Sequence, residues 1–483
     1  MTPHRSFRRR RVLALALLVA PFTARGQSVD GVVSRDTVRL SVEDAVAIAL
    51  RQSDEVGIAA AQVDVADAQY GAARANTLPQ LRFSGSYLRV YESARGQAVG
   101  SVFNQPNTYI GNANLTQTLF QGGKLVAAAR AANDSRQAAR YDEREQRAMV
   151  TLQVQRAYLE VLYTGRIAAL QDTNVLLASR RLAQVEQFER AGQAARYDVL
   201  RARVERANLE PLAIQAHNDQ ELAVLELKRV LNMPVEQPVE LVSRVDPAAA
   251  AAALLVALAD SALAPDRAAV HSAQLNLSSK RLGITVARAD YFPTFTAFIQ
   301  SGYQAYPGPG QGFPTAGGVL REDLCPPGSA AGRLCQNGGF FSDRQAGLNI
   351  SFPIFDGFRV RSNVELAIAQ SRLAEIQLQQ QREAVSLDAA RARAELRRAQ
   401  ALFAARQQNS AEAAEAFRLA TLRFARGLST QLEVSDAQLA LLTAESTEAR
   451  ATFDLFLASA DLARALGRPV PLPSAASTAP APR

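Results

Sequence analysis

The sequence predicts a mainly α-helical chain with a small β part, in which very long antiparallel helices follow short strands. Residues 124–191 contain only one glycine and no proline, and residues 359–426 contain neither, which indicates two very long helices. Short alternating runs bounded by glycine and proline precede each of these stretches and are typical of strands. One order of motifs also occurs twice, with a constant offset of 235 residues. The motifs at this offset are LTQTLFQGGKL (Leu115–Leu125) with ISFPIFDGFRV (Ile350–Val360), RAGQAARYDVLRARV (Arg190–Val204) with ARGLSTQLEVSDAQL (Ala425–Leu439), and LNMPV (Leu231–Val235) with LGRPV (Leu466–Val470).

The repeat divides the chain into two homologous halves. A further pair of motifs, ARANTLPQL (Ala73–Leu81) and ARADYFPTF (Ala287–Phe295), has an offset of 214, so the second half carries 21 extra residues before its next landmark. We therefore expect a signal peptide over 1–26, a first structural repeat over 27–233, a linker over 234–252, a second structural repeat over 253–470, and a disordered tail over 471–483.

Each half opens with a helix that stops at a proline. The pattern predicts these helices over 41–77, with Ser41 as the N-cap, and over 265–291. Pro79 and Pro293 end them because proline disfavours helical geometry in the residue before it. Both prolines therefore mark the start of a hairpin.

Two alternating runs follow each proline, so four strands are expected per chain. The first pair of strands is expected to end at Gly122 and the second pair at Gly357. The apolar residues that alternate with polar ones are Leu81, Phe83 and Tyr87, then Ala113 and Leu115, then Phe295, Ala297 and Ile299, and finally Leu348, Ile350 and Phe352.

A very long helix leaves each hairpin and turns back at a glycine. Gly122 to Gly192 and Gly357 to Gly427 both span 70 residues, which corresponds to a helix about 100 Å long. We expect tip turns at Gly192 and Gly427, and a kink at Pro211 in the first returning helix. The alanine-rich pattern suits close helix packing, and one copy offers such helices little to pack on, so self-assembly is expected.

Most of the excess positive charge lies at the N-terminus. The chain of 483 residues has 54 Lys+Arg against 46 Asp+Glu, a net charge of +8. Six of the arginines, and no acid, lie in the first 26 residues, which leaves 48 basic against 46 acidic residues. An arginine block, the apolar run 12–22 and small residues at 24–26 predict an export signal cut before Gln27.

The residue inventory argues against several functional classes. An aromatic content of 6% with no tryptophan does not suit a stacking platform for single-stranded nucleic acid. Two cysteines and three histidines are too few for the usual Cys/His metal clusters. His217 and His271 lie in helical stretches and form no catalytic set. We expect no enzymatic activity, no cofactor, no metal and no nucleic-acid partner.

The strands leave two interpretations open. The sequence has no apolar run long enough for a spanning helix, so in a bilayer only the strands could insert. Four strands cannot close a barrel, which needs eight or more, so several copies would share one. Alternatively, the hairpins cap a helical bundle, and the chain is a periplasmic coiled-coil scaffold or adaptor.

The joint order of the motifs resembles that of the TolC-type outer-membrane efflux protein family over about residues 41–470. The motifs that carry the resemblance are the helix stop A-R-A-x-x-x-P (73–79 and 287–293), the hairpin exit F-x-G-[GF]-[KR] (120–124 and 355–359), the tip turn G-x-x-x-x-[YL]-[DE]-V (192–199 and 427–434), and the close L-[NG]-x-P. The resemblance implies a homotrimer in which four strands per chain form a shared β-barrel in the outer membrane and the helices form a periplasmic α-barrel.

The resemblance also implies a function and partners. A protein of this kind is the exit duct of a tripartite efflux or secretion system. It would contact outer-membrane lipid, dock onto a periplasmic adaptor protein, and work with an inner-membrane transporter of the RND or ABC type.

The second tip turn holds the residues that the resemblance places at the channel entrance. Glu433 and Asp436, six and nine places after Gly427, match acidic positions that line the periplasmic entrance in the family. Three copies would place six carboxylates around a constriction. In a second interpretation, Glu433 forms a capping box with Thr430 and is favoured there by the helix dipole.

Other tip residues depart from the family pattern. Phe424 replaces an aromatic residue that can hydrogen-bond, and Ser429 stands where the family has a basic residue. Asp198 is the first-half counterpart of Glu433, and we expect it to form a structural ion pair with Arg201.

The two cysteines lie in the insertion of the second hairpin. Cys325 and Cys335 have nine residues between them in a Gly/Pro-rich loop that we expect on the external face. In an exported protein a disulfide between them is the expected state.

Overall fold

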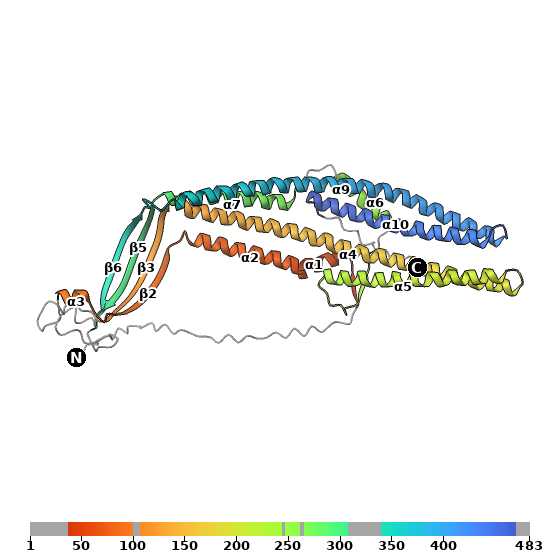
Figure 1. Ribbon diagram of the computed structural model, residues 1–483, viewed down its shortest axis with the longest axis horizontal. Coiled ribbons are helices and arrows are strands. Elements are labelled where there is room, and N and C mark those ends of the chain that lie inside the picture. The colour runs from red at the N-terminus through yellow and green to blue at the C-terminus, as the bar shows by residue number, and fades with distance from the viewer. Residues whose placement is uncertain (1–36, 100–106, 244–246, 261–264, 308–339, 470–483) are drawn as a thin grey trace, which may run out of the picture.

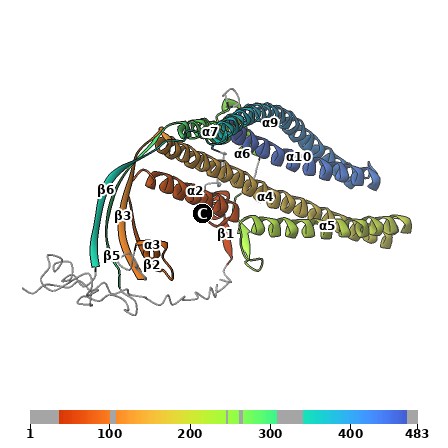
Figure 2. The ribbon, with the colours of Figure 1, turned by 60° about the vertical axis from the view of Figure 1, so that its left-hand side comes forward.

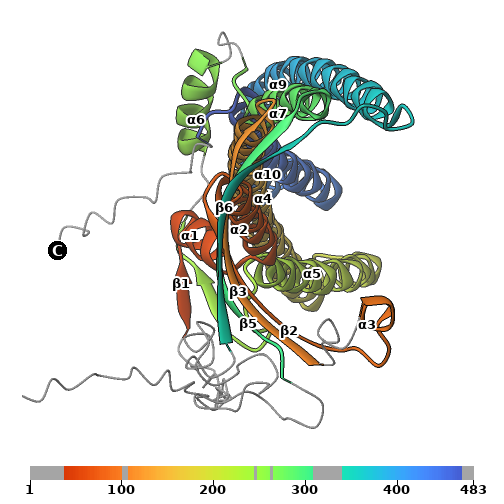
Figure 3. The ribbon, with the colours of Figure 1, turned by 90° about the vertical axis from the view of Figure 1, so that its left-hand side faces the viewer.

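The chain forms an elongated molecule with a sheet at one end and long helices that run to the other (Figure 1). The computed structural model describes residues 37–99, 107–243, 247–260, 265–307 and 340–469. Turned views show a curved sheet and helices arranged as an open, curved wall (Figures 2 and 3). The predicted signal peptide, most of the second hairpin loop with Cys325 and Cys335, and the predicted tail lie outside the described residues.

The two halves contain the same principal elements in the same order. The first half consists of β1 (Val38–Leu40), α1 (Val42–Gln52), α2 (Asp54–Ala75), β2 (Gln80–Arg89), α3 (Ala94–Val99), β3 (Asn107–Gln121), α4 (Lys124–Arg190), α5 (Arg196–Val230) and β4 (Val239–Leu241). The second half consists of α6 (Pro247–Asp260), α7 (Ala268–Arg288), the 3₁₀ turn η2 (Ala289–Tyr291), β5 (Thr294–Ala305), β6 (Phe340–Ser351), α9 (Arg359–Ala425) and α10 (Gln431–Leu466).

The two very long helices are confirmed. α4 and α9 each have 67 residues, and their buried positions are occupied largely by alanine, valine and leucine. Small side chains let neighbouring helices approach closely, so α4 packs on α2, α5 and α7, while α9 packs on α7 and α10. The contact of α10 with α4 joins the two helical hairpins. Within the described residues, no helix has the length and apolar character needed to cross a membrane.

The opening helix of the first half differs from the prediction, because it is two helices. Ser53 adopts an extended conformation that ends α1, and its hydroxyl accepts the Val56 N–H to begin α2. The predicted N-cap at Ser41 is confirmed, with a capping box to Asp44. Pro211 lies inside α5, and the helix continues through it without interruption.

All four predicted strands are confirmed, and they form one antiparallel sheet in the order β2-β3-β5-β6. Pro79 and Pro293 come directly before β2 and β5, and Gly122 and Gly357 lie between the second strand of each pair and the long helix. Among the described residues, β2 and β6 are the edge strands, and each pairs with a neighbour on one side only.

A second sheet, which the sequence analysis did not predict, holds the middle of the molecule together. β1 pairs in parallel with β4, so the start of the first half is joined to residues 234–252, the predicted linker. Tyr158 of α4 is fully buried beside this pair. Its hydroxyl donates to the Leu40 carbonyl at 2.8 Å and accepts from the Ser243 N–H at 3.2 Å.

Replacing Tyr158 with phenylalanine is expected to lower the free energy of unfolding by about 1–3 kcal/mol. The buried Ser243 N–H would lose its acceptor, and the Leu40 carbonyl would lose one of two donors and keep the Val242 N–H. Thermal unfolding in detergent, followed by circular dichroism, measures the change. The control is Tyr197→Phe on the exposed surface of α5, where little change is expected. Equal effects of both substitutions would contradict the role of the Tyr158 hydroxyl.

Candidate functional site

The four-stranded sheet has one apolar and one polar face. The register aligns Leu81, Leu115 and Ile299 across β2, β3 and β5. The next residues along the strands point to the opposite side, where the side chains are mostly polar. The polar face carries Ser84 and Ser86 of β2, Asn112 and Asn114 of β3, Gln300 and Gln304 of β5, and Asp343, Gln345 and Asn349 of β6.

Aromatic pairs lie at both ends of the apolar face. Tyr87, near the end of β2, and Tyr109, near the start of β3, stack with ring centroids 4.7 Å apart, at the end of the sheet opposite the long helix α4 that follows β3. Phe120 and Phe295 lie 5.8 Å apart near the helices. Aromatic residues at both limits of an apolar band are typical of strands in an outer membrane.

The two tip turns lie at the opposite end of the long axis (Figure 1). Gly192 and Gly427 adopt left-handed conformations, with φ of +75° and +72°. In both turns the residue after the glycine donates its N–H to a carbonyl in the preceding helix, from Gln193 to Phe188 and from Leu428 to Arg423. These are the bonds of a Schellman motif, which explains why glycine occupies both positions.

Glu433 and Asp436 lie in the first turns of α10, and both are exposed. The Glu433 N–H donates to the Thr430 hydroxyl at 3.4 Å, so Thr430 caps the helix. The reciprocal half of the capping box is not formed here. In the part of the chain that the structure describes, neither carboxylate takes part in an ion pair, so both are free to face solvent or another copy.

The remaining tip residues have structural contacts. Asp198 accepts the Ala195 N–H at 3.2 Å and caps α5. The predicted ion pair between Asp198 and Arg201 is therefore wrong for these two described residues, because the cap draws the carboxylate toward the backbone. Phe424 is half-buried, and its carbonyl accepts the Gly427 N–H at 2.9 Å.

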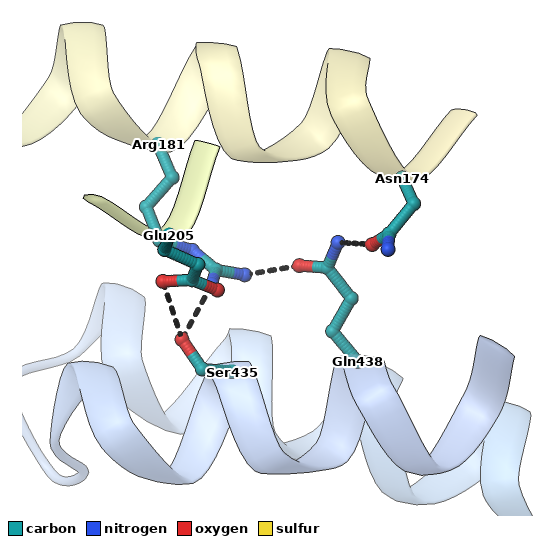
Figure 4. A network of polar contacts seen from close by, with 5 residues as sticks. All are labelled: Asn174, Arg181, Glu205, Ser435 and Gln438. Carbon is teal, nitrogen blue, oxygen red and sulfur yellow. Dashed lines mark hydrogen bonds and ion pairs between the residues drawn. The ribbon is translucent and has the colours of Figure 1, made fainter. Parts of the chain in front are cut away.

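A largely buried polar network joins α10 to α4 and α5 (Figure 4). Arg181 of α4 donates to Glu205 of α5 at 3.1 Å and to Ser435 of α10 at 2.6 Å. It also donates to Gln438, whose amide donates in turn to Asn174. The network therefore contacts α10 at residues between and beyond Glu433 and Asp436.

The network places one positive charge away from solvent. The Arg181 side chain is only 10% exposed, and that of Glu205 is 28% exposed. Burial lowers the pKa of Arg181 from its ordinary value, and the nearby carboxylate of Glu205 opposes this shift. Ser435 donates to the second oxygen of Glu205 at 3.3 Å, so both carboxylate oxygens accept a hydrogen bond.

This network was not predicted from the sequence, although the repeat contains a signal for it. At the offset of 235 residues, Arg181 corresponds to Ala416 and Glu205 to Ala440. A long polar side chain in only one of two homologous helices indicates a contact that only one half makes.

The fold and these sites define a class of protein: membrane channels in which strands with a polar and an apolar face continue into long periplasmic helices. The chain belongs to the outer membrane efflux protein family, whose sequence model matches residues 45–233 and 258–468. It is therefore an outer-membrane protein with a periplasmic extension, in a family of channels rather than enzymes. Members of the family are trimeric and work with adaptor proteins and inner-membrane pumps.

Known proteins resemble the chain along most of its length. Protein CyaE of Bordetella pertussis is 28% identical over 389 residues, which cover 75% of this chain and 70% of CyaE. The outer membrane protein VceC of Vibrio cholerae has the same fold, with a TM-score of 0.67, 20% identity, and coverage of 89% of this chain and 97% of VceC. The CmeC outer membrane channel of Campylobacter jejuni has a TM-score of 0.69 and 16% identity, with 88% and 85% of the chains covered.

Proposed function

We propose that three copies of this chain form the exit duct of a tripartite efflux or secretion system, which passively conducts small molecules or exported cargo. A periplasmic adaptor protein would join the duct to an inner-membrane transporter of the RND or ABC type. The observation that carries the proposal is the sheet, whose edge strands β2 and β6 pair with no described strand on their outer sides.

Unpaired strand edges require a partner in a membrane. Each edge presents backbone N–H and C=O groups that lipid cannot satisfy. Since the four strands cannot close on themselves, β6 of one copy would pair with β2 of the next. This head-to-tail contact joins two different surfaces of the chain, the β6 edge and the β2 edge. Such a contact forms a closed ring of three copies when each copy is rotated by one third of a turn from the previous one.

The two faces of the sheet then have separate roles. The apolar face, with Phe83, Leu115 and Ile299, would contact lipid. The polar face, with Asn112 and Gln300, would line the lumen. Amide and hydroxyl side chains give such a lumen hydrogen-bonding capacity with little net charge, which suits a duct that does not select its cargo.

The proposal is tested by locating the protein in cells and measuring current. We expect fractionation with the outer membrane, a heat-sensitive trimer in SDS gels, and ion current after insertion of the purified trimer into planar bilayers. A monomer in the soluble periplasmic fraction that carries no current would instead support the scaffold interpretation.

We further propose that Glu433 and Asp436 line the periplasmic entrance. Replacing both with alanine is expected to raise the single-channel conductance or reduce the preference for cations, because the entrance would lose six carboxylates in a trimer. The measurement is single-channel current and reversal potential in a salt gradient.

A matched variant separates the entrance from general charge loss. Asp219→Ala with Glu412→Ala removes two exposed acids far from the tip turns, and we expect the current of the unmodified protein. Unchanged current and selectivity in the Glu433 and Asp436 variant would remove these residues from the entrance.

A further inference from the structure

Within one chain, the end of β3 contacts the start of β5. Phe120 pairs with Phe295 in the sheet register, and their rings lie 5.8 Å apart. Lys124 is the first residue of α4, and Asp290 lies in η2, directly after α7. The Lys124 ammonium lies 2.7 Å from the Asp290 carboxylate. An aromatic pair and an ion pair therefore join the exit of the first hairpin to the entry of the second.

The internal repeat gives each of these four residues a counterpart. By the offset of 235, Phe120 and Lys124 correspond to Phe355 and Arg359; by the offset of 214, Phe295 and Asp290 correspond to Leu81 and Asn76. These counterparts cannot meet inside one chain. Phe355 follows β6 and Leu81 lies in β2, and the two edge strands are three strand spacings apart, about 14 Å.

The counterparts Phe355 and Leu81 are more exposed than Phe120 and Phe295 of the internal junction. Phe120 is 43% exposed and Phe295 is half-buried, whereas Phe355 is 78% and Leu81 is 74% exposed. The change in burial matches the absence of a neighbouring strand at each edge.

A strained residue marks the same place. Phe358 adopts a φ of +65°, in the left-handed region that aromatic residues rarely occupy, where its counterpart is Gly123. Within the chain its ring contacts Phe355 edge-on at 5.8 Å and is otherwise 65% exposed. A strained backbone conformation persists only where the surrounding structure holds it in place, and such residues cluster at functional positions. Here the strained residue lies beside Phe355, so two aromatic rings are exposed next to the edge strand β6.

We infer that Phe355 and Arg359 of one copy contact Leu81 and Asn76 of the neighbouring copy, so that the junction between copies repeats the junction within the chain. The inference rests on the proposed function, because it requires β6 of one copy beside β2 of the next. The occupant of this apolar edge is a second copy because the repeat supplies both sides of the contact. The Asn76 amide oxygen can accept from the Arg359 guanidinium as the Asp290 carboxylate accepts from Lys124.

A disulfide trap tests the contact directly. In a background with serine at positions 325 and 335, Phe355→Cys with Leu81→Cys is expected to give covalent dimers and trimers under oxidising conditions. Since a disulfide needs Cα atoms within about 7 Å, it can form only between copies. The matched control, Phe355→Cys with Leu88→Cys, moves the second cysteine about 23 Å along the same strand and should give no covalent trimer.

The trap distinguishes failure of this contact from failure of the proposed function. A trimer seen by light scattering that yields no disulfide from the Phe355 and Leu81 pair overturns the inference and leaves the duct intact. Absence of any trimer overturns the duct, and the inference with it.

A gain-of-function variant tests the polar half of the junction. Asn76→Asp should recreate across the copies the ion pair that Lys124 and Asp290 make within one, and raise the temperature of trimer dissociation by about 2–4 °C. The gain should disappear in the double variant with Arg359→Gln. An equal gain with and without Arg359 would show that the two residues do not meet.

A fluorescent probe tests whether lipid, rather than a second copy, lies against Phe355. Because the chain has no tryptophan, Phe355→Trp gives a single indole signal. We expect weak quenching by brominated lipids, in contrast to strong quenching of Phe83→Trp on the apolar face. Equal quenching at both positions would place lipid, rather than a second copy, against Phe355.

Discussion

Replacing Arg181 with methionine is expected to lower the free energy of unfolding by about 2–4 kcal/mol. The substitution keeps the apolar stem but leaves the Glu205 carboxylate without its cation and Gln438 without its donor. Both partners are largely buried, so water cannot fully replace the lost contacts. Thermal unfolding of the purified protein, followed by circular dichroism, measures the loss.

Two further variants isolate the buried network. Arg203→Met removes an exposed ion pair to Glu186 and is expected to change stability by less than about 1 kcal/mol. Adding Glu205→Leu to Arg181→Met should recover part of the loss, since no unpaired carboxylate then remains. If Arg181→Met and Arg203→Met behaved alike, the network would contribute nothing beyond a surface contact.

Replacing Gly467 with alanine is expected to cost about 3 kcal/mol or more. Gly467 ends α10 with a φ of +72°, and a Cβ there would lie 2.1 Å from the Asp266 carbonyl oxygen. The start of α7 would have to move away from the end of α10, and the Asp266 N–H would lose its bond to the Leu466 carbonyl.

Gly427 supplies a control with the same backbone conformation. It also has a φ of +72°, but an added Cβ would meet nothing within 4 Å. Gly427→Ala should therefore show only the conformational cost, about 1–2 kcal/mol. If Gly467→Ala had a melting temperature as high as that of Gly427→Ala, the backbone at Asp266 would be able to move away from the added Cβ at little cost in stability.

The elements with strong local signals could be predicted from the sequence. The near absence of glycine and proline defined α4, their complete absence defined α9, and alternation bounded by glycine and proline defined the four strands. These signals depend on neighbouring residues. The break at Ser53 was missed because serine fits a helix and a cap about equally until tertiary contacts decide. The β1–β4 pair was missed because each strand has three residues, and their pairing joins positions about 200 residues apart.

The polar contacts near the tip were harder to predict. Glu433 and Asp436 were chosen through the family resemblance, from their spacing after Gly427, and their place at the entrance stays a prediction. Arg181 lies in a long helix with many other arginines, and its burial depends on how α10 lies against α4 and α5. For Asp198, two local partners were available, and the sequence could not decide between a side-chain pair and a backbone cap.

The network around Arg181 has a mechanical consequence for a ring of three duplicated chains. Such a ring has six seams between helical hairpins, three within chains and three between them. By the offset of 235 residues, Arg181 corresponds to Ala416 and Ser435 corresponds to Leu200. At the equivalent position, a contact between two chains would therefore have Ala416 and Leu200 in place of Arg181 and Ser435. The contacts within chains, which have the polar network, would resist separation more than the contacts between chains. The opening of the ring would therefore widen with threefold rather than sixfold symmetry.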